Sequence, residues 1–105
     1  MTPETAPGTS SLLTAKVTVP QHVVYRSFPA ETVVLNLQTG KYHGLNATAG
    51  QVLEALERAA CVRDAAATLA TDYEQDQSVV ERDVCELCQS LLERGLIETD
   101  GSPAP

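Results

Sequence analysis

The stretch Thr32-Val-Val-Leu-Asn-Leu-Gln-Thr-Gly-Lys-Tyr-His-Gly-Leu45 decides the fold. It contains two short blocks rich in β-branched, leucine and tyrosine residues, separated by a turn that includes Gly40. This arrangement predicts a β-hairpin, because glycine readily adopts the positive φ that such a turn requires. In the first strand, Val33, Leu35 and Leu37 alternate with other residues and therefore share one face. We expect this face to be the buried one.

The segment before the hairpin predicts one more strand. Lys16–Val19 and His22–Phe28 are both rich in β-branched residues, and Pro20 interrupts them. Because proline cannot donate a hydrogen bond to a β-ladder, we interpret the two blocks as one broken or edge-located strand. The early half of the chain thus predicts a three-stranded antiparallel sheet.

Near Asn46 the pattern changes from strand alternation to helical spacing. Thr48-Ala-Gly-Gln51 matches a capping box and predicts the start of a helix that ends near Ala60. An alanine-rich second helix is expected from about Arg63 to Tyr73. Both helices carry apolar residues at core spacing.

The last helix has the strongest helical pattern in the chain. Ser78-Val-Val-Glu81 is a second capping box, and Gly95 supplies the left-handed residue after the last turn. A continuous apolar stripe follows the helix at steps of four, three and four residues. The stripe consists of Val80, Val84, Leu87 and Leu91.

These elements predict an α+β fold that is winged helix-turn-helix-like, with a three-stranded antiparallel sheet followed by three helices. The 105 residues leave room for one domain, and the 43% of hydrophobic residues suffices for a packed core. We expect this domain to span residues 15–98. The segments 1–14 and 99–105 contain prolines and glycines without any period and predict disordered tails.

The charge distribution opposes a nucleic-acid-binding function. The chain has 7 basic and 14 acidic residues, a net charge of −7. The last helix, which enters the major groove in DNA-binding winged helices, is acidic here and would be repelled by phosphates. We therefore predict no nucleic-acid partner, although a nucleic-acid-binding winged helix stays open as an alternative.

Cys85 and Cys88 form a Cys-x-x-Cys pair that could indicate a metal or redox site. Such pairs normally lie in a loop or at a helix N-terminus, whereas these two fall in the middle of the predicted last helix. Beside the apolar stripe, cysteine serves as a small hydrophobic residue. We favour packing and keep a small metal or redox protein as the alternative.

No pattern in the chain predicts an enzyme. Glycine-rich phosphate loops and the Gly-x-Ser-x-Gly motif do not occur, and no nucleophile or carboxylate pair accompanies His43. We predict no catalytic residue, no cofactor and no metal site. No stretch has the pattern of a secretory signal or the roughly 20 apolar residues of a membrane helix. We therefore expect a cytoplasmic protein without a membrane partner.

The ordered set of motifs resembles the PqqD-like family. The resemblance is carried by Thr32–Gly50, Val52–Leu56, Arg82–Leu87 and Leu91–Ile97, with the motifs LNL-x-TGKY, LN-x-T, DV-x-x-L and L-x-x-GLI. It covers roughly residues 17–98. Members are recognition elements for ribosomally synthesised, post-translationally modified peptides (RiPPs). The absence of tryptophan and the form of the hairpin are more similar to the stand-alone recognition proteins of lasso-peptide clusters.

This resemblance implies that the protein binds the leader peptide of a precursor as an added strand. The leader would lie along the third strand and pack against the third helix. The implied partners are a transglutaminase-like leader peptidase and an ATP-dependent cyclase. Carried over position by position, the expected peptide-binding residues are Lys41, Tyr42, His43, Gly44 and Leu45 in the strand, and Val80, Asp83, Val84, Leu87 and Leu91 in the groove.

Overall fold

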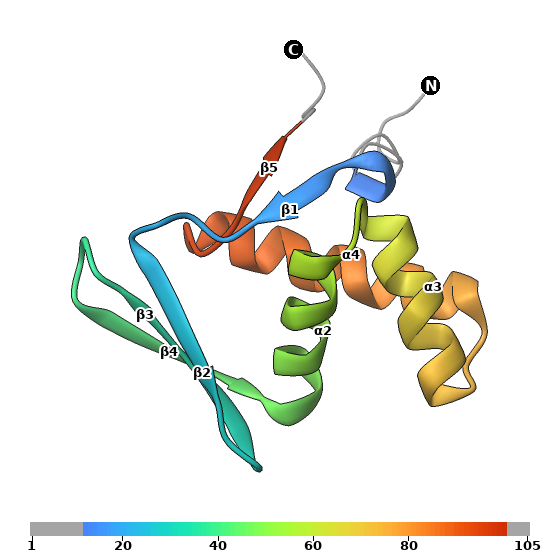
Figure 1. Cartoon of the computed structure of the whole chain (residues 1–105), viewed down its shortest axis with the longest axis horizontal. Helices are drawn as coiled ribbons and strands as arrows, with labels where there is room; N and C mark the ends of the chain where they lie inside the picture. Colours follow the sequence, from blue (N-terminus) through green and yellow to red (C-terminus); the bar gives the residue numbers. More distant parts are fainter. Residues whose placement is uncertain (1–11, 101–105) are drawn as a thin grey trace.

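A computed structural model describes residues 12–100 of the chain. Its main sheet has three antiparallel strands in the order β2–β3–β4 (Figure 1). They are β2 (Val23–Ser27), β3 (Glu31–Asn36) and β4 (Lys41–Asn46). The predicted hairpin is therefore confirmed, and Gly40 in its turn has a φ of 75°.

A second, two-stranded sheet joins the two ends of the described chain. In it β1 (Lys16–Thr18) pairs antiparallel with β5 (Glu98–Asp100). The prediction of one broken first strand is therefore wrong, because β1 and β2 belong to different sheets. The physical reason is a tight turn at Pro20, whose carbonyl oxygen accepts a 3.0 Å hydrogen bond from the Val23 amide and redirects the chain.

The predicted tails are too long at both ends. Residues 12–14 are helical, and Leu12 belongs to the hydrophobic core. At the other end β5 continues to Asp100, because it has a pairing partner in β1. The remaining parts of the predicted tails, residues 1–11 and 101–105, lie outside the described residues.

Three helices follow the sheet, as predicted. They are α2 (Ala47–Arg58), α3 (Val62–Tyr73) and α4 (Gln77–Glu93). Figure 1 shows α2 standing between the sheet and the α3–α4 pair. None of the helices among residues 12–100 is long and apolar enough to cross a membrane.

The two predicted capping boxes are wrong in position. The N-cap of α2 is Asn46, whose side-chain oxygen accepts a 2.8 Å hydrogen bond from the Ala49 amide. Asn46 is also the last residue of β4, so the helix follows the strand without a loop, and Thr48 lies inside the helix. At α4 the Ser78 hydroxyl donates to the carboxylate of Asp76, the residue at the N-cap position.

The sheet buries the face opposite to the predicted one. Thr32, Val34 and Asn36 are buried, whereas Val33 and Leu35 are half-buried. Leu37, the third member of the predicted face, is 57% exposed. The prediction that the alternating valine and leucines form the buried face is therefore wrong.

The position of α2 explains this inversion. The helix starts directly after β4 and packs on the face of the sheet that carries Thr32 and its cross-strand partner Leu45. The buried polar groups on this face have partners, as buried polar groups require. The Thr32 hydroxyl lies 3.1 Å from the Ser27 hydroxyl, and the Asn36 side chain accepts hydrogen bonds from two turn amides.

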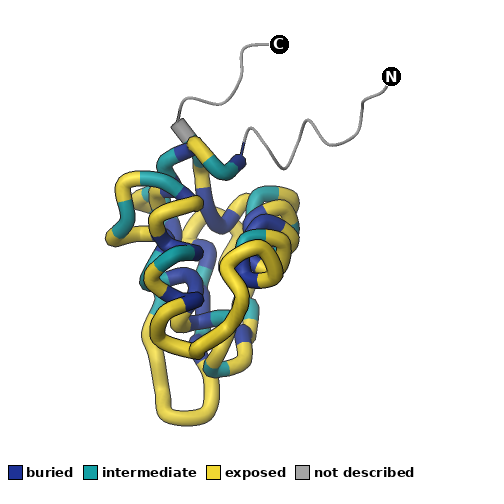
Figure 2. The backbone as a smooth tube through the Cα atoms, turned by 90° about the vertical axis from the view of Figure 1, so that its right-hand side faces the viewer, coloured by how far each residue is buried: buried dark blue, intermediate teal, exposed yellow. Residues whose placement is uncertain are grey.

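The core lies between the sheet and the helices. Figure 2 shows buried segments on the inside and exposed turns at the periphery. Of the predicted stripe on α4, Val80, Val84 and Leu91 are buried, and Leu87 packs partly buried against the core. The Lys16 ammonium of β1 donates to two carbonyl oxygens at the end of α2 and ties the small sheet to the helical layer.

Candidate functional site

The hydrogen-bond register of the main sheet determines which residues of β3 bond to β2 and which bond to β4. Phe28 and Glu31 exchange backbone hydrogen bonds of 2.7 and 3.3 Å, and the Leu37 amide donates to the His22 carbonyl oxygen. Because the bonding direction alternates along an antiparallel strand, the odd-numbered residues of β3 bond to β2. The even-numbered residues of β3 therefore bond to β4.

This register leaves backbone groups of β4 at the edge of the sheet. The even-numbered residues of β3 pair with Lys41, His43 and Leu45. Tyr42 and Gly44 consequently direct their N–H and C=O groups away from β3. Within residues 12–100 β4 pairs with β3 alone, so these groups form an open edge to which an extended peptide could add.

The side chains of β4 lie on both faces of the sheet. Tyr42 is 72% exposed, Lys41 is exposed, and His43 is half-buried. Leu45 is a core residue, so only its backbone belongs to the strand region. A Cβ placed on Gly44 would have the Glu31 carboxylate as its nearest neighbour, at an ordinary 3.6 Å. A small side chain would therefore fit at this position without a clash.

A groove of about 400 Å³ lies where the end of α3 meets the starts of α2 and α4. We call it the helical groove. Its walls are largely aliphatic with polar groups at intervals, a lining suited to side-chain anchors. Thr48 in its wall is only two residues beyond the end of β4, so the groove lies close to that end of the strand. The lining residues are Thr48, Val52, Leu69, Tyr73, Gln75, Val79, Val80, Asp83 and Val84.

The helical groove brings together part of the predicted set. Val80, Asp83 and Val84 line it, and Leu87 and Leu91 do not. Leu91 has no exposed surface, and Leu87 packs against the core. The contributions of α2 and α3 were missed, because they depend on how three helix ends meet. The exposed Val79 beside the stripe was the one local signal for a wider apolar surface.

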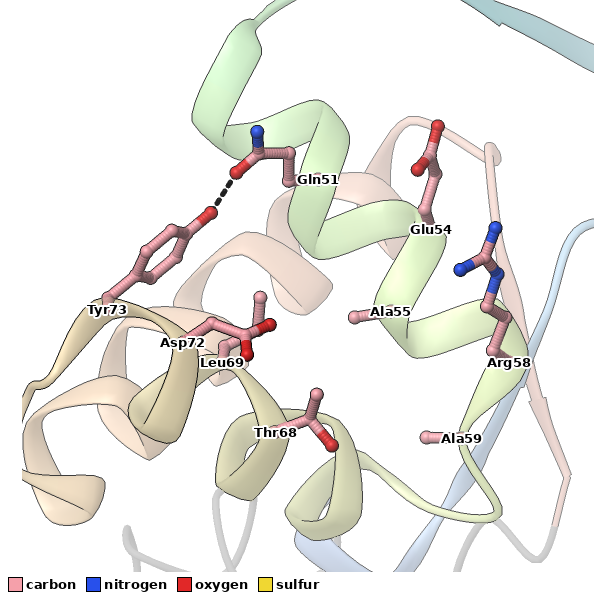
Figure 3. Close-up of a pocket in the computed structure, with 9 residues that line it drawn as sticks. All are labelled: Gln51, Glu54, Ala55, Arg58, Ala59, Thr68, Leu69, Asp72 and Tyr73. Carbon is pink, nitrogen blue, oxygen red and sulfur yellow. Dashed lines mark hydrogen bonds between the residues drawn. The ribbon is translucent and has the colours of Figure 1, made fainter.

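A second, more polar cleft of about 460 Å³ lies between α2 and α3 (Figure 3). Glu54, Arg58 and Asp72 give it charged walls. Tyr73 donates a hydrogen bond to the Gln51 side chain across its mouth. Tyr73 lines both this cleft and the helical groove, so it stands on the boundary between the two.

The cysteine pair belongs to the core. Cys85 and Cys88 are 2% and 0% exposed and lie among the aliphatic residues of the core cluster, as the packing interpretation predicted. Burial raises the pKa of the Cys85 thiol, and burial together with Cys85 raises the pKa of Cys88 to about 12. Such thiols are poor nucleophiles at neutral pH. Within residues 12–100 no group of three potential ligands is placed to hold a metal ion.

Fold and edge together define a class of protein. A three-stranded sheet with an open last strand, followed by three helices with a groove between their ends, is a small α+β domain to whose edge an extended chain could add. The family described as coenzyme PQQ synthesis protein D (PqqD) matches residues 31–97. The chain therefore belongs to the PqqD family.

Two solved structures with the same fold are similar to this chain. One is described as TbiB1 in complex with the TbiA(beta) leader peptide, with a TM-score of 0.70 and 28% identity over 83% of this chain and 99% of that one. The other is lasso peptide synthetase B1 complexed with the leader peptide, with a TM-score of 0.71 and 27% identity over 80% and 99%. No curated protein sequence matches the chain. The resemblance to PqqD-like RiPP recognition elements is thus confirmed.

Proposed function

We propose that this protein binds the leader peptide of a ribosomally synthesised precursor, of the lasso class, by strand addition to β4. The observation that carries the proposal is the open edge, where Tyr42 and Gly44 direct backbone donors and acceptors outward. The two similar solved structures, which are complexes with leader peptides, support it.

In strand addition to β4, the affinity and the specificity for the peptide come from different contacts. Main-chain hydrogen bonds to β4 hold any extended peptide, while pockets for alternate side chains select the sequence. The helical groove supplies such pockets through Val80 and Val84, with Asp83 as a charged group at its wall. An apolar leader side chain fills the groove, and Asp83 favours a neutral or basic neighbour over an acidic one.

The bound leader is then presented to other proteins. The protein itself performs no chemistry in this proposal and delivers the precursor to a transglutaminase-like leader peptidase and an ATP-dependent cyclase. The core thiols of Cys85 and Cys88 fit this binding role, because their raised pKa values keep them protonated at neutral pH.

A titration with two synthetic peptides tests the proposal. The labelled leader of a lasso precursor that this protein serves should bind with a Kd in the nanomolar to micromolar range, roughly −12 to −8 kcal/mol. The core peptide of the same precursor is the control and should not bind, because it lacks the anchors for the groove. Equal binding of both peptides would refute leader recognition.

A further inference from the structure

The helical groove and the cleft between α2 and α3 meet at the side chain of Tyr73. We call this cleft the polar cleft, after its charged walls. Two of the residues that line these cavities, Leu69 and Tyr73, line both of them. Leu69 is only 4% exposed and lies beneath, whereas Tyr73 is 39% exposed and lies at the surface. The Tyr73 ring therefore divides the helical groove from the polar cleft.

A hydrogen bond holds the Tyr73 ring in this dividing position. Tyr73 is the last residue of α3, and its hydroxyl donates to the Gln51 side chain of α2 (Figure 3). Gln51 lines the polar cleft and does not line the helical groove. Because tyrosine combines an apolar ring with a polar tip, this one side chain suits an aliphatic cavity on one side and a polar cavity on the other.

The two cavities differ in their charge. The helical groove has aliphatic walls, and Asp83 is the charged residue that lines it. The polar cleft is lined by two carboxylates, Glu54 and Asp72, and by the Arg58 guanidinium. Glu54 accepts a 2.8 Å hydrogen bond from the Ser27 hydroxyl, whereas Asp72 has no hydrogen bond or ion pair with any of residues 12–100. The polar cleft thus offers a carboxylate to a cation.

This division determines which leader side chains the helical groove can hold. An apolar side chain that enters the groove is buried against aliphatic walls, which is favourable. Lysine and arginine carry a charged head at the end of an apolar stem. With the Tyr73 ring in place, that head stays in the groove, where burial of an unpaired charge is costly. Without the ring, the head could extend to the Asp72 carboxylate in the polar cleft.

We propose that Tyr73 is a specificity-determining residue for the leader, because its ring closes the helical groove toward the polar cleft and restricts the anchoring side chain to an apolar one. This inference rests on the proposed function and names the residue that excludes basic anchors. Removal of the ring should join the two cavities into one that accepts a long basic side chain, with its charge at Asp72.

The test first locates the anchor in a synthetic leader that binds the parent protein. Each apolar leader residue is replaced by alanine, and the Kd is measured by fluorescence anisotropy for the parent and for Val79→Ala, a change in an exposed wall of the helical groove. The anchor is the leader residue whose replacement is not additive with Val79→Ala. If no leader residue is coupled to Val79 in this way, the inference is overturned, because the groove then holds no anchor.

A leader with arginine in place of the anchor then measures the selectivity, as the ratio of its Kd to that of the natural leader. In the parent this ratio should be about tenfold or more. In Tyr73→Ala it should fall by about fivefold or more, because the arginine reaches the polar cleft. Adding Asp72→Asn to Tyr73→Ala should reverse most of this fall, since it removes the carboxylate that pairs with the arginine.

Two further variants separate the ring from other effects. Tyr73→Phe keeps the ring and loses the hydrogen bond to Gln51, so its ratio should change less than that of Tyr73→Ala. Thr68→Ala alters a residue that lines the polar cleft and not the groove. It is the matched control and should leave the ratio within about twofold of the parent. Circular dichroism establishes that each variant is folded, and Tyr73→Leu replaces Tyr73→Ala if the latter is not.

The outcomes distinguish this inference from the proposed function. A parent protein that does not bind the leader would refute the proposed function itself. A parent that binds the leader through a groove anchor, with the same ratio in Tyr73→Ala, would overturn the role of Tyr73 alone. A lower ratio in Tyr73→Ala that Asp72→Asn leaves unchanged would also overturn it, because the arginine would then find its partner outside the polar cleft.

Discussion

Gly50 of α2 and Thr32 of β3 lie so close together that no side chain fits between them. A Cβ built on Gly50 would lie 2.7 Å from the Thr32 Cβ and closer still to its hydroxyl oxygen. Real Cβ atoms do not approach a neighbouring Cβ to this distance. The glycine therefore sets how closely α2 approaches the sheet, and with it the position of Thr48 and Val52 in the helical groove.

Replacing Gly50 with alanine should destabilise the protein by about 1–3 kcal/mol, because the methyl group overpacks a contact to a rigid atom. At a solvent-exposed helix position the same change would stabilise the protein by up to about 1 kcal/mol. A destabilisation would therefore show that residue 50 is in close contact with Thr32. Urea denaturation measures it. Gly44→Ala is the control, since its Cβ has ordinary space. A Gly50→Ala variant as stable as the parent would contradict the packing.

The N-cap of α2 gives a second prediction. Asn46→Ala removes the acceptor of the 2.8 Å hydrogen bond from the Ala49 amide and should cost about 1 kcal/mol of unfolding free energy. Thr48→Ala is the matched control, because Thr48 is exposed inside the helix and caps nothing. A larger loss of unfolding free energy in Thr48→Ala than in Asn46→Ala, measured by urea denaturation, would show that the helix starts with the capping box that the sequence predicts.

Local patterns were sufficient to predict much of the fold. The hairpin follows from two β-rich blocks around Gly40, and the three helices follow from apolar spacing that each segment shows by itself. The strand β5 could not be found this way, because it is supported by pairing with β1, whose residues lie 80 to 84 positions earlier in the chain. Residues Glu98–Asp100 have no pattern of their own that separates them from the tail.

The inverted sheet face shows why the site was predicted only in part. Val33, Leu35 and Leu37 are more apolar than Thr32 and Asn36, so composition alone selects the wrong face for burial. The burial is decided by where α2 packs, which is a tertiary contact. The helical groove has the same origin, since Leu69 of α3 and Val80 of α4 meet only after the helices are assembled.

The buried thiols predict a loss of stability at alkaline pH. The pKa of Cys88 is raised by burial and by Cys85 from 9.0 to about 12. Unfolding therefore releases a proton between these two values, so the unfolding free energy is fully retained below pH 9 and falls as the pH approaches 12. Burial and a hydrogen bond to Glu57 also raise the pKa of Tyr25, so its ionisation lowers the unfolding free energy at alkaline pH in the same way.

Urea denaturation at about pH 8 and about pH 10.5, with reductant present, measures this loss. Cys88→Ala should be less stable than the parent at the lower pH, because the substitution leaves a cavity in the core. Its further loss on going to the higher pH should be smaller than that of the parent, since one titrating group has been removed. If both proteins lost the same amount of unfolding free energy between the two pH values, the Cys88 thiol would not contribute to the alkaline loss of stability.

The register of β4 gives the sharpest prediction about peptide binding. Of residues 41–45, Tyr42 and Gly44 direct their amides to the open edge, whereas Lys41, His43 and Leu45 direct theirs to β3. Addition of the leader should therefore slow amide exchange at Tyr42 and Gly44 in NMR experiments. The alternate residues should change little, because their amides are on the side of the strand that faces β3.

Gly44→Pro should abolish leader binding, because proline removes the outward N–H at the centre of the proposed ladder. His43→Ala removes a side chain only and should weaken binding much less. Gly44→Ala keeps the N–H in ordinary space and serves as the matched control for a change at this position. Circular dichroism first establishes that each variant is folded. A folded Gly44→Pro variant with normal leader affinity, together with unchanged exchange at Tyr42 and Gly44 in the parent, would show that the peptide binds elsewhere.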